Sequence, residues 1–174
     1  MVWRKPNTEF NKDNLVPTVK HGGGSVMVWG CMAANGTGEL VFIEGNMDKT
    51  MYLDILKQNL KKSAEKLGIK DTFKYYQDND PKHKSYLVRE WLLYNCPKVI
   101  ETPPQSPDLN PIEHLWEILD RKIRTRPISS KTELKARLKE EWTQIGSETT
   151  KKLVKNMRNR LQQVIKQKGY PTKY

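Results

Sequence analysis

The sequence predicts an α/β domain, and three observations lead to that prediction. Apolar and partly β-branched segments near the start of the chain are typical of buried strands. Short segments with strand and helix patterns alternate through the middle of the chain. The last third carries apolar residues at helical spacing among many basic residues. A chain of 174 residues in this order suits a single domain, residues 1–174, that ends in a helical basic tail.

The first predicted elements form a β-hairpin. Residues 25–34 are apolar and partly β-branched, which predicts a buried strand. Residues 35–38 read Asn-Gly-Thr-Gly, and Asn and Gly tolerate the positive φ angles that tight hairpin turns require. Residues 39–43 are therefore expected to return as the second strand.

The middle of the chain predicts alternating helices and short strands. Leucines recur at helical spacing over residues 50–67, and Gly68 is a suitable helix stop. The aromatic segment 73–77 predicts a short strand. A helix is expected over residues 85–94, followed by a brief strand at residues 99–100.

The C-terminal part predicts a loop followed by three helices. Residues 103–111 are rich in proline, which predicts a loop. A helix is expected from Pro111 to about Arg124, with an apolar stripe of Ile112, Leu115, Trp116, Leu119 and Ile123. Ser130 and Glu133 have the spacing of a capping box that opens a further helix. The last helix carries Leu153, Met157, Leu161, Val164 and Ile165.

The excess of basic residues lies in the last third of the chain. Residues 1–120 hold 15 basic and 16 acidic side chains (net −1), whereas residues 121–174 hold 16 basic and 4 acidic (net +12), for a total of +11. Such asymmetry predicts a polyanionic partner, most often nucleic acid. Charge alone leaves open the alternative of a solvated basic surface on an ordinary helical tail.

Several classes of protein are not indicated by this sequence. Cys31 and Cys96 are far apart and lack CxxC or His spacing, so neither a zinc site nor a disulfide framework is predicted. No apolar segment is long enough to span a bilayer, and the first residues do not resemble a signal peptide. We therefore expect no membrane partner.

Asp78 is the first candidate site residue. It follows the aromatic segment at the end of a predicted strand, where a sheet can fix the position of a catalytic side chain. The next residues, Asn79, Asp80 and Pro81, are also typical of a simple turn. Taken alone, Asp78 fits this turn interpretation.

Glu113 is the second candidate, and it too has a structural alternative. Asn110 is a good N-cap, Pro111 is favoured at the first helical position, and Glu113 then lies at the third. A capping box worth ~1 kcal/mol would explain Glu113 without any function. Together, however, two carboxylates separated by 34 residues (113 − 78 − 1) could hold divalent metal ions against a phosphodiester.

Two basic groups are candidate phosphate contacts. Lys82, His83 and Lys84 closely follow Asp78, and a solvated loop is the alternative explanation. The other group lies at the far end of the helix that Glu113 opens. Its cations would also be favoured by the helix dipole alone: Arg121, Lys122, Arg124 and Arg126.

Three segments resemble the Tc/mariner superfamily of DDE transposases: residues 77–83 (QDNDPKH), residues 105–116 (QSPDLNPIEHLW) and the glycine-rich residues 17–25 (PTVKHGGGS). The resemblance implies an RNase H-like mixed sheet flanked by helices and a reaction of metal-dependent DNA strand cleavage and strand transfer. It further implies Mg²⁺ or Mn²⁺ as cofactor, with Asp78 as the second catalytic acid and Glu113 as the third. Transposon ends and target DNA are the implied partners, in the nucleus, with a homodimer possible for a complete protein.

One departure from the family pattern affects the expected activity. The family's first catalytic aspartate lies on a strand upstream of the segment matched by residues 2–5. Glu9 and Asp13 do not lie in a strand-like context and are poor substitutes. We therefore expect a truncated catalytic domain that lacks its first, central strand and has two of three acids. The alternative is a catalytically inactive DNA-binding remnant of a transposable element.

Overall fold

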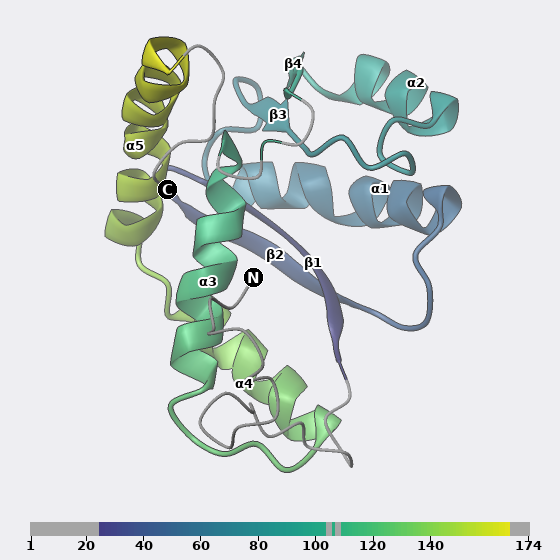
Figure 1. Cartoon of the computed structure of the whole chain (residues 1–174). Coiled ribbons are helices and arrows are strands. Elements are labelled where there is room, and N and C mark those ends of the chain that lie inside the picture. Colours follow the sequence, from purple (N-terminus) through teal and green to yellow (C-terminus); the bar gives the residue numbers. More distant parts are fainter. Residues whose placement is uncertain (1–24, 104–105, 107–108, 168–174) are drawn as a thin grey trace, which may run out of the picture.

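The computed structural model describes residues 25–103, 106 and 109–167. The predictions for residues 2–5, Glu9, Asp13 and the glycine-rich segment up to residue 24 lie outside the described residues. Within them the elements follow the predicted order and give a mixed α/β architecture (Figure 1).

The predicted N-terminal hairpin is present. Strands β1 (Met27–Ala33) and β2 (Gly36–Ile43) pair in antiparallel fashion. The turn lies at residues 34–35, one residue earlier than predicted, because Gly36 with φ +143° already pairs with Ala33. A bulge between Gly30 and Met32 shifts the register further along the hairpin.

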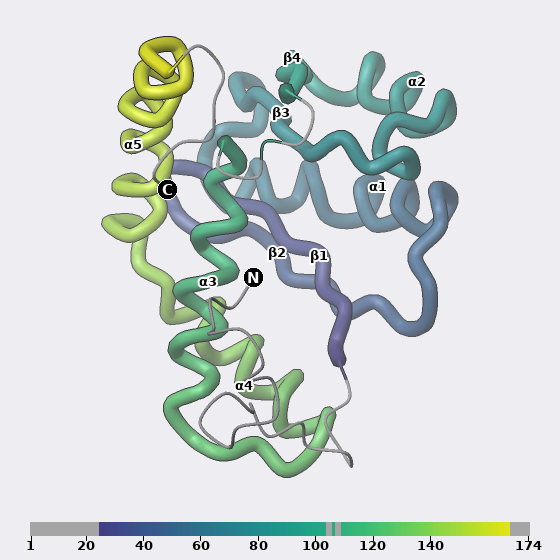
Figure 2. Tube along the Cα trace, in the orientation of Figure 1, coloured from purple at the N-terminus to yellow at the C-terminus, as the bar shows by residue number. Residues whose placement is uncertain are grey.

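Helices cover both faces of this hairpin. Alternate residues of β1 and β2 face helix α1 (Lys49–Lys66) and pack into one hydrophobic cluster. The opposite residues pack against α3 (Pro111–Ile123) and α4 (Lys131–Thr143). Figure 2 shows the hairpin running between these two groups of helices. Burial on both faces explains the apolar residues on both sides of β1 and of the second half of β2.

Helix α1 begins at a well-formed cap and approaches β2 closely. The Asp48 carboxylate accepts the main-chain N–H groups of Thr50 and Met51 at 2.9 and 2.8 Å. Gly38 permits the close approach, since a Cβ at this position would lie 2.7 Å from the Cβ of Ser63. Ser63 in turn accepts the main-chain N–H of Glu39 at 3.0 Å.

A second, separate sheet holds the candidate site. Strand β3 (Lys74–Tyr76) pairs in parallel with β4 (Lys98–Ile100), and α2 (Tyr86–Asn95) connects them. The described strands therefore form two two-stranded sheets and not one continuous sheet. Between β1 and β3 lies a cavity of about 760 Å³ that both strands line.

The capping box predicted for α4 is present only in part. The Ser130 hydroxyl accepts the main-chain N–H of Glu133 at 3.1 Å, as predicted. The Glu133 carboxylate, however, accepts the main-chain N–H of Ser129 at 2.9 Å instead of that of Ser130. Ser130 is thus the N-cap, as predicted, and only the reciprocal bond of the Glu133 side chain differs.

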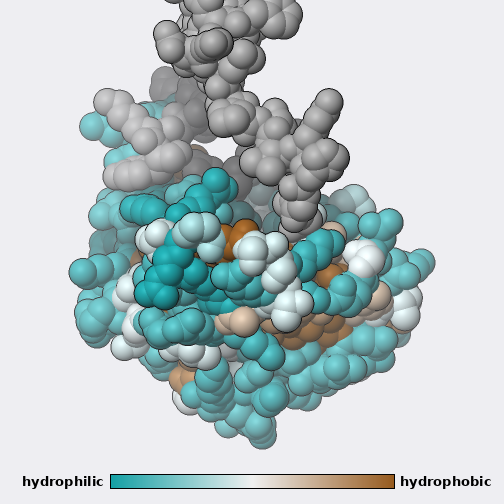
Figure 3. All heavy atoms as spheres, turned by 90° about the horizontal axis from the view of Figure 1, so that it is seen from below, coloured by the Kyte–Doolittle hydropathy of each residue, from teal (hydrophilic) through white to brown (hydrophobic). Residues whose placement is uncertain are grey.

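The last helix, α5 (Ser147–Lys166), is the predicted helical basic tail. Its buried Thr150 donates to the main-chain oxygen of Ala34 at 3.2 Å, which fixes the start of the helix to the hairpin turn. Its exposed basic residues are Lys151, Lys152, Lys155, Arg158 and Lys166. The face of the molecule in Figure 3 is largely hydrophilic, with small hydrophobic patches between polar side chains. Among the described residues, no helix is apolar and long enough to span a membrane.

Candidate two-carboxylate site

Asp78 lies in the loop that follows β3, as predicted. The strand ends at Tyr76, whose hydroxyl donates to the main-chain oxygen of Leu109 at 2.7 Å. The Asn79 side chain donates to the main-chain oxygens of Thr102 and Pro103 at 3.1 and 2.9 Å. These bonds fasten the loop that carries Asp78 to the segment that leads into α3.

Glu113 is the third residue of α3, but the predicted capping box is wrong. The Asn110 side chain makes no capping hydrogen bond to the helix. It instead donates from Nδ2 to the Glu113 carboxylate, Oε1, at 3.4 Å. Asn110 is nevertheless the N-cap and Pro111 opens the helix, as predicted, so Glu113 lies in the first turn, where the helix dipole favours an acid.

Asp78 and Glu113 line the same cavity between β1 and β3. The pKa of Glu113 is raised, first by burial and then by the negative charge of Asp78. A negative charge raises the pKa of a carboxyl group that faces it, so this direction is consistent with two acids that share one cavity. The structure thus brings together the two acids of the distant sequence motifs.

The Asp78 carboxylate is held through one of its oxygens. Oδ1 contacts Nδ1 of His83 and accepts the main-chain N–H of Asp80 at 3.1 Å. The hydrogen bond from His83 is the main reason that the pKa of Asp78 is lowered. Oδ2 has no hydrogen-bond partner among the described residues, and the same holds for Oε2 of Glu113. The turn interpretation of Asp78 is therefore correct for one oxygen only.

The residues present suit a divalent metal ion in their chemistry. Two carboxylates that line one cavity, each with an oxygen that accepts no hydrogen bond from the described residues, are the hard ligands that Mg²⁺ and Mn²⁺ prefer. Within the described ranges, no group of three or more His, Cys, Asp and Glu residues could hold a metal ion. The described site therefore offers two acidic ligands.

The basic residues proposed to contact phosphate differ in their surroundings. Lys82 forms an ion pair with Asp80 at 3.4 Å, while Lys84 is exposed. His83 is largely buried and directed at Asp78.

The cluster at the end of α3 is also divided. Lys122 pairs with Glu141 at 3.2 Å, and Arg124 pairs with Asp120 at 2.7 Å. Arg121 and Arg126 are exposed. Their role in DNA binding stays a prediction.

Sequence reasoning missed one functional candidate, Tyr52 of α1. Its ring stacks on His83 and its hydroxyl donates to Gln77 at 2.7 Å. The sequence pattern does not mark Tyr52 as a site residue, although it lies beside the apolar stripe of the predicted helix. A tyrosine on such a stripe signals a buried hydroxyl that needs a partner, but the partner itself is fixed only by the fold.

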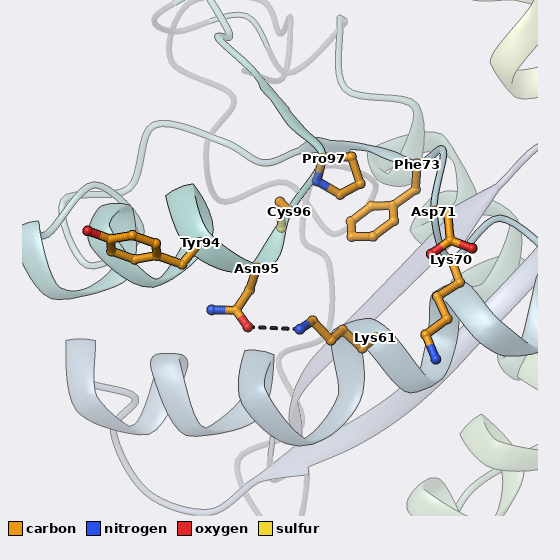
Figure 4. Close-up of a pocket in the computed structure, with 8 residues that line it drawn as sticks. All are labelled: Lys61, Lys70, Asp71, Phe73, Tyr94, Asn95, Cys96 and Pro97. Carbon is orange, nitrogen blue, oxygen red and sulfur yellow. Dashed lines mark hydrogen bonds between the residues drawn. The ribbon is translucent and has the colours of Figure 1, made fainter.

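A second, smaller pocket of about 340 Å³ lies between α1, α2 and the segment before β4 (Figure 4). Lys61 lines it and donates to the Asn95 side chain at 2.9 Å. Neither Asp78 nor Glu113 lines this pocket, so it is separate from the two-carboxylate site.

Residues 4–135 match the family model described as "DDE superfamily endonuclease". The chain is 44% identical over 158 residues to the transposable element Tcb1 transposase of Caenorhabditis briggsae, covering 91% of this chain and 58% of that protein. It is 40% identical to the transposable element Tc1 transposase of Caenorhabditis elegans, covering 99% of this chain and 63% of that protein. The chain thus spans about three fifths of the length of these relatives.

Solved structures of Mos1 transposase share the fold. The catalytic domain of Mos1 mariner transposase superposes with a TM-score of 0.77 at 18% identity, covering 88% of this chain and 78% of that one. The same domain with raltegravir and Mg gives 0.75 at 19% identity, over 85% and 77% of the two chains. The Mos1 strand transfer complex gives 0.76 at 16% identity, over 99% and 50%. The predicted RNase H-like α/β fold class is confirmed by this similarity.

Proposed function

The chain belongs to the DDE superfamily of endonucleases, and on that premise we propose that residues 1–174 form the catalytic-domain part of a DNA transposase. The proposed reaction is metal-dependent DNA strand cleavage and strand transfer. Transposase relatives at 40–44% identity support this assignment.

The observation that carries the proposal is the meeting of Asp78 and Glu113 at one cavity. Asp78 projects from the loop after β3 and Glu113 from the first turn of α3. Each would offer the oxygen that accepts no hydrogen bond from the described residues, and together they would orient the scissile phosphate. Mg²⁺ or Mn²⁺, when bound, supplies Lewis-acid activation of the attacking and leaving oxygens.

DNA is the proposed partner, in the form of transposon ends and target DNA. The net charge of +12 over residues 121–174 supports it, as does the solved Mos1 strand transfer complex. The proposed phosphate contacts are Lys82, His83, Lys84, Arg121, Lys122, Arg124 and Arg126. We further propose that the protein acts in the nucleus and that a longer form would act as a homodimer.

A second candidate function is DNA binding without catalysis. The net charge of +12 over residues 121–174 favours it, because a basic surface can bind a polyanion without any catalytic group. It predicts binding that is indifferent to sequence, weakens steeply with salt, and is accompanied by no cleavage in Mn²⁺.

The test is Mn²⁺ binding, followed by electron paramagnetic resonance, together with nicking of supercoiled plasmid. Asp78→Asn and Glu113→Gln should each weaken Mn²⁺ binding at least tenfold. The matched control is Glu117→Gln, one helical turn further along α3 and outside the cavity, which should change the affinity less than twofold, about the effect of an exposed charge. Mn²⁺ binding that survives both site substitutions would contradict the proposed metal site.

Plasmid nicking separates the two candidate functions. Mn²⁺-dependent nicking that is lost in Asp78→Asn supports the enzyme. DNA binding with a steep salt dependence and no nicking supports the remnant.

A further inference from the structure

The imidazole of His83 lies between the Asp78 carboxylate and the ring of Tyr52. Its Nδ1 contacts Oδ1 of Asp78, and its ring lies against that of Tyr52 with centroids 3.9 Å apart and planes inclined by 28°. The His83 side chain is 14% exposed, whereas that of Asp78 is 54% exposed. A largely buried ring therefore holds an exposed carboxylate.

Hydrogen bonds from the core fix Tyr52 in turn. Its hydroxyl donates to Oε1 of Gln77 at 2.7 Å. Because the single proton is used there, the Tyr75 hydroxyl is the donor in its 2.9 Å contact with Tyr52. The Gln77 amide then donates to the main-chain oxygen of His83 at 3.2 Å. Tyr52 thus acts on His83 through its ring and, by way of Gln77, through the main chain.

These contacts connect the buried core to the loop that carries Asp78. Tyr52 is 1% exposed and belongs to α1, while Asp78 lies in the loop after β3. Of the two imidazole nitrogens, Nδ1 contacts Asp78. Nε2 is buried and has no hydrogen-bond partner among the described residues. The orientation of the ring is therefore set by Tyr52 on its face and by Asp78 at its edge.

We propose that Tyr52 and His83 are positioning residues for Asp78. The Tyr52 ring fixes the plane of the imidazole, the imidazole holds Oδ1, and Oδ2 is left to face the cavity that Glu113 also lines. This inference rests on the proposed metal-dependent function. Residues that orient a ligand in this way typically change metal affinity 10–100-fold when they are lost.

The first experiment replaces His83. His83→Phe keeps a flat ring against Tyr52 but removes the donor to Asp78, and we expect Mn²⁺ affinity to fall about 10–100-fold. His83→Asn should restore most of the affinity, because its amide can donate from the place of Nδ1. The free energy of unfolding, measured in parallel, should change far less than the affinity.

The second experiment replaces the supporting ring. Tyr52→Leu should also lower Mn²⁺ affinity. The double variant Tyr52→Leu with His83→Phe should bind Mn²⁺ no more weakly than the single variant with the larger loss, because the two residues act in series. Tyr86→Leu is the control, since Tyr86 is 81% exposed on α2. If Tyr52→Leu does not fold, the His83 variants decide the question.

A readout without metal separates this inference from the proposed function. Three-bond couplings of Asp78 in the metal-free protein should show a single χ1 rotamer in the wild type and rotamer averaging in His83→Phe. A wild type that binds no Mn²⁺ would remove the proposed function, while the Asp78 rotamer would still test the positioning. An unchanged rotamer and unchanged Mn²⁺ affinity in His83→Phe would overturn the proposal. A loss of DNA affinity with the Asp78 rotamer and the Mn²⁺ affinity both unchanged would also overturn it, and would leave His83 with the proposed phosphate contact only.

Discussion

Trp142 of α4 donates its indole N–H to the main-chain oxygen of Gly38 in β2, at 3.0 Å and across 104 residues of sequence. A return bond runs from the Thr37 hydroxyl to the main-chain oxygen of Trp142 at 3.2 Å. All three residues lie in buried surroundings. This pair of bonds joins the C-terminal helices to the N-terminal hairpin.

Trp142→Phe should lower the free energy of unfolding by about 1 kcal/mol, because it removes the 3.0 Å indole hydrogen bond and leaves the Gly38 oxygen with only the longer 3.4 Å bond from Lys66. Urea denaturation measures the change. Trp91→Phe is the matched control, since Trp91 is half-buried and its indole nitrogen has no hydrogen-bond partner among the described residues. Equal losses in the two variants would show that ring size, and not the hydrogen bond, is responsible.

Gly38→Ala should also destabilise the fold, by about 1–3 kcal/mol, because of overpacking. The new Cβ would lie 2.5 Å from Sγ of Cys31 and 2.7 Å from Cβ of Ser63, so α1 would have to move away from β2. Thermal unfolding detects the loss. Gly146→Ala provides the comparison, since nothing lies within 4 Å of its Cβ, and its cost should stay near that of a weaker N-cap, below about 1 kcal/mol.

Glu113→Gln should slightly stabilise the metal-free protein at pH 7, by less than about 1 kcal/mol. The pKa of Glu113 is raised by burial and by Asp78, so the folded state disfavours its ionised form. The destabilising contribution is present above the raised pKa and disappears below the ordinary value of 4.5, where the group is protonated in both states.

Chemical denaturation at pH 7 and pH 4 tests this sign. The difference in the free energy of unfolding between the wild type and Glu113→Gln should be smaller at pH 4 than at pH 7. Glu90→Gln, an exposed substitution on α2, should show no such pattern. A loss of stability in Glu113→Gln at pH 7 would instead favour a structural role for the carboxylate.

Cys31 and Cys96 should react slowly with a thiol reagent in the folded protein. Burial raises the pKa of Cys31, and burial raises the pKa of Cys96 to about 11. Since the thiolate is the reactive form, the rate for Cys96 should rise as the pH approaches that value. Reaction at pH 8 before and after unfolding measures the effect, and fast labelling of the folded protein would contradict it.

The order of helices and strands followed from sequence periodicity, because each apolar stripe has one way to be buried. The helix from Pro111 is the clearest case, with its buried Leu115 and Leu119 where the pattern placed them. Caps were harder to predict. The side chains of both Asn110 and Glu133 bond to neighbours other than the expected ones, since several nearby polar groups compete for each of them.

The sequence predicted the two acids of the candidate site but not the residues that position them. The motifs around Asp78 and Glu113 are local in sequence and were recognisable. The stacking of Tyr52 on His83 joins α1 to the loop after β3, and nothing in either segment alone specifies that contact. The division of the strands into two sheets also depends on long-range packing that periodicity does not encode.

The hairpin that lies between two layers of helices has a consequence for biosynthesis. Residues 49–66 reach one side of β1 and β2 soon after these strands emerge from the ribosome, but α3 and α4 follow much later. Until then Val28, Leu40 and Phe42 lack the helices that they pack against among the described residues. A nascent chain that stalls before α4 would expose one apolar face of the β1–β2 hairpin. We therefore expect chaperone binding to be strongest at that stage of translation.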